Sequence, residues 1–262
     1  MKSAVKYLNL VLLCLATIVL VGLHNQAAGW SILFLSGFTL ILSKRDLAKD
    51  LLPLHGSIAI LGLTPITTDI SYGHIFEMSL ALTAAVALPY LVSRYVYKND
   101  RIVFRFHHGR RWFKREIFYI ALAGVIAYLL LPFYLQNTGA YLNWPSETDF
   151  SSIVRLFIGT NGLGIWDEFF FICTVLGILR HHFTFKWANL FQAIMFSSFL
   201  YELGFTGWGP AMVFIFALTQ GYIFKKTESL LYVIAIHLTV DFILFLALVN
   251  AHNPSMFNIF IT

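Results

Sequence analysis

The chain has 262 residues, of which 58% are hydrophobic and only 12% are charged, and its formal net charge is +5. With a mean hydropathy of +0.75, this composition excludes an ordinary water-soluble domain, which carries about 25% charged residues. A membrane-spanning helix needs ~20 apolar residues, so the chain has room for roughly seven to nine spans and for no sizeable soluble domain. We therefore expect an all-α fold, a polytopic transmembrane bundle of about eight to nine helices.

Nine apolar segments follow one another along the chain. The expected spans are residues 4–23, 28–43, 52–67, 74–97, 116–136, 161–180, 187–205, 210–224 and 229–249. The third segment, LLPLHGSIAILGLTPI, is the weakest, because its two prolines, two glycines and one histidine suit a broken or re-entrant helix equally well. Before the sixth span, the stretch from Asp149 to Thr160 is expected to form an interfacial helix.

Basic residues gather in every second connection between these spans. They lie at positions 2 and 6, at 44, 45 and 49, throughout 94–115, at 180 and 186, and at 225 and 226. The intervening connections, 24–27, 68–73, 135–149 and 206–209, contain no Lys or Arg. By the positive-inside rule this alternation predicts a cytoplasmic N-terminus and an external C-terminus. We expect an integral multi-pass protein of a prokaryotic plasma membrane.

The first span could also be interpreted as a signal peptide, which would leave the charge alternation unchanged. Residues 24–29 lack a clear small-x-small pattern for cleavage, so we expect an uncleaved anchor. The connection from Lys98 to Arg115 reads KNDRIVFRFHHGRRWFKR and interleaves basic with aromatic residues. This pattern is typical of a segment that lies on anionic lipid headgroups. Nucleic-acid binding is the less favoured interpretation, and no nucleic-acid partner is expected.

Ionisable residues interrupt two of the most apolar stretches. GIWDEFFFI contains Asp167 and Glu168, and AIHLTVDFILF contains His237 and Asp241. Counted from the nearest charged residue at the inner boundary, Glu168, Asp241 and Glu202 lie ~18, ~20 and ~24 Å along their helices. These depths fall beyond the inner third of a ~30 Å hydrocarbon core. Ionisable groups at such depth usually pair with one another and mark a functional site. His237 and Asp241, four residues apart, share one helix face.

The segment from Trp166 to Val249 resembles the CAAX-protease and bacteriocin-processing family, also called CPBP or Abi, of intramembrane glutamic-type endopeptidases. Members of that family carry an EExxxR motif, then FxxxH on the next helix, and finally HxxxN or HxxxD. Here Asp167-Glu168 stands at the paired acids and His237-x-x-x-Asp241 at the last motif. Between them, FIFALTQGYIFKKTESLL matches a glycine-containing helix and a Thr-x-Ser-Leu turn. The resemblance implies a protease core at 151–262, preceded by N-terminal transmembrane helices at 1–150.

The chain departs from the family motifs at three positions. Ile172 stands where the family has arginine, and the first acid is the shorter Asp167. The second motif has no histidine: the best-fitting register is Phe196-Ser-Ser-Phe-Leu200, and a later register runs from Tyr201 to Phe205.

The resemblance also implies roles for individual residues. Glu168 would act as the general base that activates a water molecule, and His237 would polarise the scissile carbonyl or hold that water. Asp241 would orient His237, while Glu202 or Tyr201 would take the place of the absent histidine. The candidate catalytic residues are Glu168, His237, Asp241, Asp167 and Glu202.

No cofactor is expected, because the sequence has no phosphate-binding glycine loop, GxSxG elbow or HExxH motif. Cys14 and Cys173 lie singly in apolar spans and match no metal-binding spacing. A bound metal remains open, although one histidine and three carboxylates make a poor zinc set. Its ligands would be His237, Asp241, Glu168 and Glu202.

Three interpretations of the function follow. The favoured one is an intramembrane endopeptidase that cleaves membrane-tethered or lipid-modified peptides or proteins. The second is a catalytically degenerate relative that binds or scaffolds such molecules without cutting them. The third is a proton-coupled transporter that uses the ionisable group as a relay. Each ionisable residue also has a non-functional interpretation. Glu168 and His237 could form a hydrogen bond that only stabilises the helix bundle, and Glu202 could simply reach the membrane–water interface.

Overall fold

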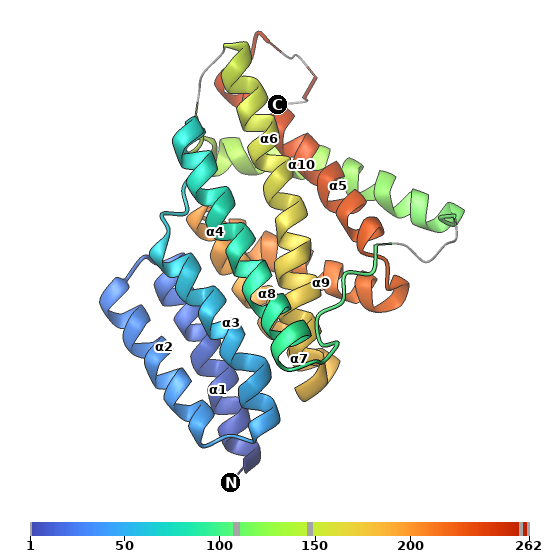
Figure 1. Ribbon diagram of the computed structural model, residues 1–262. Helices are drawn as coiled ribbons and strands as arrows, with labels where there is room; N and C mark the ends of the chain where they lie inside the picture. Colours follow the sequence, from blue (N-terminus) through green and yellow to red (C-terminus); the bar gives the residue numbers. More distant parts are fainter. Residues whose placement is uncertain (1, 107–110, 146–148, 257–258, 261–262) are drawn as a thin grey trace.

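The structure is a computed structural model that describes residues 2–106, 111–145, 149–256 and 259–260 (Figure 1). These residues form nine continuous helical rods and no β-strand. The predicted all-α bundle of eight to nine helices is therefore confirmed. The bounds of the helices are α1 (Lys2–Ala16), α2 (Gln26–Ile41), α3 (Arg45–Leu63), α4 (Tyr72–Leu91), α5 (Lys114–Thr138), α6 (Phe150–Asp167), α7 (Gly177–His182), α8 (Phe185–Glu202), α9 (Gly209–Thr227) and α10 (Leu230–His252).

Three of the rods contain π-helical segments. One segment, Thr17–Gly22, extends α1, and another, Val92–Val96, extends α4. The longest, Glu168–Leu176, joins α6 to α7 so that all three form one rod. A short 3₁₀ turn, Ala140–Asn143, follows α5.

The structure tests two expectations about helix boundaries. The third expected span, 52–67, forms one unbroken helix with Pro53 inside it, not a broken one, but its bounds are Arg45 to Leu63. An internal proline costs ~3 kcal/mol, but Leu51 and Leu54 beside it are fully buried and hold the helix in place. The expected interfacial helix before the sixth span is not separate, because the rod runs continuously from Phe150 to His182.

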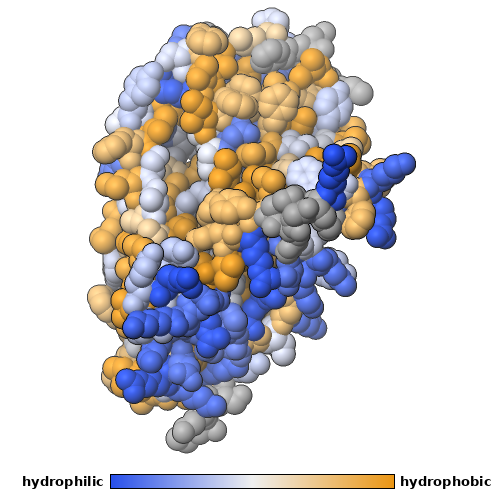
Figure 2. All heavy atoms as spheres, turned by 45° about the vertical axis from the view of Figure 1, so that its right-hand side comes forward, coloured by the Kyte–Doolittle hydropathy of each residue, from blue (hydrophilic) through white to orange (hydrophobic). Residues whose placement is uncertain are grey.

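Among the described residues, five helical stretches are long and apolar enough to cross a membrane: 4–22, 72–96, 114–138, 150–182 and 230–252. Figure 2 shows hydrophilic side chains gathered over one end of the molecule, with a broad apolar surface beyond them. This segregation is what a multi-pass membrane protein requires. Residues 107–110 of the segment expected to contact lipid headgroups lie outside the described residues.

A buried ionic cluster ties the N-terminal helices to the rod that contains the π-helical segment Glu168–Leu176. Asp50 of α3 is buried, and its Oδ2 atom lies 2.6 Å from Nε2 of His182 and 3.1 Å from Nε of Arg101. Asn99 donates a hydrogen bond of 3.2 Å to the other carboxylate oxygen. Removing one member of a buried ion pair leaves the other charge uncompensated. This cluster therefore fixes the rod against α3.

We predict that Gly29→Ala destabilises the bundle. A Cβ atom on Gly29 of α2 would lie 2.6 Å from the Cα atom of Leu20, so α2 and the π-helical segment Thr17–Gly22 would have to move apart. Overpacking of this kind costs ~1–3 kcal/mol. Thermal unfolding in detergent should show a lower midpoint for this variant. Gly37→Ala on the same helix is the matched control, because its added Cβ meets no atom within 4 Å. Equal midpoints for the two variants would contradict the prediction.

Candidate active site

The paired acids lie where the rod changes its helical geometry. Asp167 is the last residue of α6, and Glu168 is the first residue of the π-helical segment. Both side chains are buried, with 2% and 1% of their surface exposed. A π-helical turn changes the direction of the side chains that follow it, and such turns are frequent at functional sites. The two adjacent buried carboxyl groups therefore lie at the junction between α6 and the π-helical segment.

His237 of α10 lies between these acids and Asp241. Its Nδ1 atom is 2.8 Å from Oε1 of Glu168, which is a hydrogen bond. Its Nε2 atom is 3.8 Å from Oδ2 of Asp167 and 3.7 Å from Oδ1 of Asp241. The structure thus brings four of the five candidate residues together around one imidazole ring. We call these four residues, Asp167, Glu168, His237 and Asp241, the acid–histidine cluster.

Aromatic rings surround the imidazole of His237. The ring of Phe216 lies 5.0 Å from it at 77°, and that of Phe196 lies 6.0 Å from it at 70°. Phe196 is the first residue of Phe196-Ser-Ser-Phe-Leu200, the best-fitting register of the second family motif. Leu200, one turn later in α8, faces the same region, since it lines the cavity that His237 also lines. In this register, an apolar side chain occupies the position of the motif histidine.

A glycine of α6 makes room for Asp241. A Cβ atom on Gly164 would lie 1.8 Å from Oδ2 of Asp241 and 3.1 Å from Cδ2 of His237. Small residues let membrane helices approach one another closely. Gly164 therefore determines how near α10 can bring its carboxyl group to α6.

Gln220 of α9 belongs to the site but was not singled out from the sequence. Its Nε2 atom donates to Oε1 of Glu168 at 2.8 Å and to the carbonyl oxygen of Val233 at 3.0 Å. If the Gln220 amide were turned over, its oxygen would face the Glu168 carboxylate and the Val233 carbonyl, which are both acceptors. These two contacts therefore fix the orientation of the amide. The signal that could have found it is a lone amide in an apolar helix, since such groups bond across helices in membranes.

Several oxygen atoms of the site accept no hydrogen bond from the described protein atoms. They are Oδ1 of Asp167, Oε2 of Glu168, Oδ2 of Asp241 and Oε1 of Gln220. If every carboxyl group were ionised, the cluster would hold three negative charges against at most one positive imidazole. A buried site disfavours such an imbalance. We therefore expect the cluster to retain shared protons.

A cavity of about 540 Å³ reaches the cluster from the side. It lies between α5, α9 and α10, and His237, Asp241 and Gln220 line its polar end. Glu168 and Asp167 do not line the cavity but lie behind His237. The remaining lining is almost entirely apolar and includes exposed side chains such as Ile126 and Ile215. Since these side chains lie on the outer surface of the bundle, the cavity opens toward lipid.

Glu202, the fifth candidate, is not brought to the cluster. Its Oε1 atom lies 2.9 Å from Nε2 of His24, at the far end of α8. Tyr201 beside it is 38% exposed. The four-ligand metal set considered from the sequence is thus not assembled. Among the residues that the structure describes, no group of three or more His, Cys, Asp or Glu is arranged to hold a metal ion.

The comparison with protein families bears on the same part of the chain. Residues 149–243 match the family described as type II CAAX prenyl endopeptidase Rce1-like. The matched segment runs from α6 to α10 and contains the whole acid–histidine cluster and Gln220. The resemblance predicted from the motifs is confirmed over these residues, and the matched family is a protease family. No curated protein and no solved structure matches the chain.

We predict that Gly164→Ala disturbs the cluster by pushing Asp241 away from α6. The added Cβ would clash with the carboxylate at 1.8 Å, and the cost should be ~1–3 kcal/mol of stability. Gly162→Ala on the same helix is the control, because its Cβ would meet nothing within 4 Å. The two variants are compared by thermal unfolding in detergent. A Gly164→Ala midpoint at or above that of Gly162→Ala would show that the close approach is not required.

Proposed function

We propose that this protein is an intramembrane endopeptidase that hydrolyses peptide bonds of membrane-tethered or lipid-modified proteins. The observation that carries the proposal is the Glu168–His237 hydrogen bond, made at the closed end of an apolar cavity. It lies in the segment that matches a protease family. A hydrogen-bonded carboxylate and imidazole beside a substrate-sized cavity is a recurring arrangement in hydrolases.

The shape and lining of the cavity support a substrate that is anchored in the membrane. Its walls are apolar and open toward lipid, so a hydrocarbon chain or an apolar peptide segment can enter without leaving the membrane. The polar end offers His237, Asp241 and Gln220 to the part of the substrate that reaches it. A substrate anchored by its apolar part would thus present a peptide bond to the acid–histidine cluster.

In the mechanism that we propose, Glu168 and His237 act as one unit. Glu168 accepts a hydrogen bond from the Nδ1–H group of His237, which leaves the unprotonated Nε2 atom directed toward Asp241. A water molecule at the end of the cavity attacks the scissile carbonyl carbon and gives its proton to Nε2. The same proton then passes to the leaving amine as the C–N bond breaks, which yields a carboxylic acid and an amine.

Asp241 has a separate role in this scheme. In its protonated form it can donate a hydrogen bond to the oxyanion, as a neutral asparagine would. Gln220 holds Glu168, because its Nε2 atom donates to the same oxygen that accepts from His237. This assignment differs from the direct role of Glu168 as base, because Glu168 lies behind His237 and does not line the cavity.

A second candidate function is substrate binding without cleavage. The observation in its favour is apolar residues at two motif positions: Leu200 lines the cavity, and Ile172 is buried in the π-helical segment. A proton-coupled transporter is supported less well, because Glu202 pairs with His24 and does not join the cluster.

The proposed activity predicts that Glu168→Gln and His237→Ala abolish proteolysis, by about 10³-fold or more, while both proteins still insert into the membrane. The measurement is a comparison of membrane-peptide termini in cells that express wild-type or variant protein at equal levels. Glu77→Gln is the control, since Glu77 is an exposed carboxylate on α4. New termini that appear with wild type and with Glu77→Gln, but with neither site variant, are expected. Identical termini in all four samples would favour binding without cleavage.

The cavity predicts that Ala123→Trp reduces cleavage by about tenfold or more, because the indole would fill the space that the substrate needs. Ala123 lines the cavity from α5. Ala121→Trp is the matched control, since Ala121 lies two residues away, is exposed and does not line the cavity. Cleavage of a substrate identified from the termini is measured for both variants. Equal rates would show that substrate does not enter between α5 and α9.

A further inference from the structure

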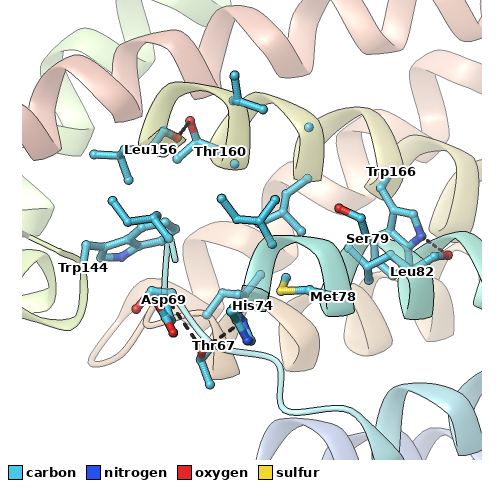
Figure 3. A pocket seen from close by; sticks show the side chains of 18 of the residues that line it. Thr67, Asp69, His74, Met78, Ser79, Leu82, Trp144, Leu156, Thr160 and Trp166 are labelled. Atoms are coloured by element: carbon cyan, nitrogen blue, oxygen red, sulfur yellow. Dashed lines mark hydrogen bonds between the residues drawn. The ribbon is translucent and has the colours of Figure 1, made fainter. Parts of the chain in front are cut away.

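A second hollow lies between α4 and α6, at the end of the molecule where the connections carry no basic residue (Figure 3). Its volume is about 240 Å³. We call it the α4–α6 shaft. Apolar side chains of both helices form its walls, and the rim is polar. The wall residues include Ile75, Met78, Leu82, Leu156 and Leu163, and the rim residues include Thr67, Asp69 and His74.

The floor of the shaft is closed and apolar. The indole nitrogen of Trp166 donates to the carbonyl oxygen of Leu82 at 2.8 Å, so it offers no donor to a ligand. The indole also stacks on Phe170, with centroids 4.9 Å apart. No residue of the acid–histidine cluster lines the shaft. The shaft is therefore a blind site and not an entrance to the candidate active site.

Two glycines keep one wall of the shaft open. A Cβ atom on Gly159 or Gly162 of α6 would meet no atom within 4 Å. Larger side chains would therefore project into open space without a backbone clash. The absence of side chains at these positions leaves a groove along the α6 backbone, into which a narrow apolar ligand can fit.

The depth of the shaft matches one leaflet of a bilayer. Its lining runs along α4 from His74 to Thr83 and along α6 from Leu156 to Trp166. At 1.5 Å per residue these stretches are ~14 and ~15 Å long. The hydrocarbon core of a bilayer is ~30 Å thick, so the shaft is about as deep as a single leaflet. The acyl chain of a phospholipid spans one leaflet and therefore has about the length of the shaft.

The rim carries a negative charge. Asp69 accepts hydrogen bonds from the backbone N–H of Ser71 at 2.8 Å and from its hydroxyl at 3.0 Å. These bonds lower the pKa of the Asp69 carboxyl below its usual range, so it is ionised at neutral pH. Beside it, Thr67 and His74 are joined by a hydrogen bond of 3.1 Å. A carboxylate at the mouth of an apolar shaft complements an amphiphile whose head carries a cation.

The shaft opens into an adjoining hollow of about 460 Å³ that can hold a headgroup. Asp69 lines this hollow together with Thr68, Ser71 and Arg155. Arg155 also donates to the carbonyl oxygen of Ile70 at 2.8 Å, so its guanidinium stays at this wall. Its other guanidinium nitrogens donate to the hydroxyl groups of Ser151 and Ser152, so Arg155 holds this wall in place and Asp69 is the group that we assign to the headgroup.

We propose that the α4–α6 shaft binds one phosphatidylethanolamine molecule, with an acyl chain against Gly159 and Gly162 and the ammonium group at Asp69. The bound lipid belongs to the leaflet opposite the basic connections. Phosphatidylglycerol has the same acyl chains and the same phosphate, but it has no ammonium group to pair with the Asp69 carboxylate. With a volume of about 240 Å³, the shaft is too small for a helix of a second chain. The proposal is independent of proteolysis, because the lipid site and the cavity at the cluster share no lining residue.

The test is native mass spectrometry of the full-length protein after incubation with equal amounts of phosphatidylethanolamine and phosphatidylglycerol. We expect wild type to retain one phosphatidylethanolamine in preference to phosphatidylglycerol. Gly162→Leu should fill the groove and lower the retained lipid by about tenfold, the effect of losing 1.4 kcal/mol of binding free energy. Gly37→Leu is the matched control, since its Cβ would also meet nothing within 4 Å but lies on α2. Asp69→Asn should abolish the preference for ethanolamine while an acyl chain still binds.

A second variant keeps the test decisive if Gly162→Leu does not fold. Ser79→Phe fills the shaft from α4, where Ser79 lines the wall. Equal lipid retention by wild type and by a folded shaft-filling variant would overturn the proposal. Equal retention of both lipids by wild type would overturn the headgroup assignment. Because no cleavage is measured, neither result depends on whether the protein is a protease.

Discussion

The hydrogen bond between Glu168 and His237 joins the rod that contains α6 and α7 to the last helix. Each of these groups would be costly alone in an apolar interior, and each becomes acceptable because the other satisfies it. The neighbouring residues hold these two side chains in place. Gln220 donates to the same oxygen of Glu168, Gly164 allows Asp241 to approach, and phenyl rings enclose the imidazole. The chemistry that we propose depends on this arrangement, because the bond directs Nε2 of His237.

The acid–histidine cluster and the α4–α6 shaft lie on different faces of α6. One face meets α10 and the acid–histidine cluster, where the larger cavity ends at polar groups. The other face meets α4 and a shaft that ends at an indole ring. Trp166 and Asp167 are adjacent in the chain, yet they belong to these two environments. A lipid that fills the shaft would therefore contact the helix from which the acids project, without reaching them.

Much of the bundle follows from the sequence, because apolar length and alternating charge determine where a chain crosses a membrane. The expected segments correspond to the helices. The ionisable residues inside apolar stretches, Asp167, Glu168, His237 and Asp241, converge in the structure, and the depth argument had selected two of them, Glu168 and Asp241. The same argument also selected Glu202, which pairs with His24. Depth places a residue along a helix axis but says nothing about rotation around it. In lipid, apolar residues cover all faces of a helix, so periodicity could not show which way Glu202 or Gln220 points.

The wall of the larger cavity comes from two different parts of the chain. The groups that would perform chemistry lie within residues 149–243, the segment that matches the protease family. One wall of the cavity, however, is α5, which precedes that segment and contributes Leu122, Ile126 and Leu130. Substitutions in α5 can therefore reshape this wall of the cavity while the acid–histidine cluster stays unchanged. In the proposed peptidase, exchange of α5 between related chains would therefore alter one wall of the substrate site, while the walls formed by α9 and α10 stay with the acid–histidine cluster.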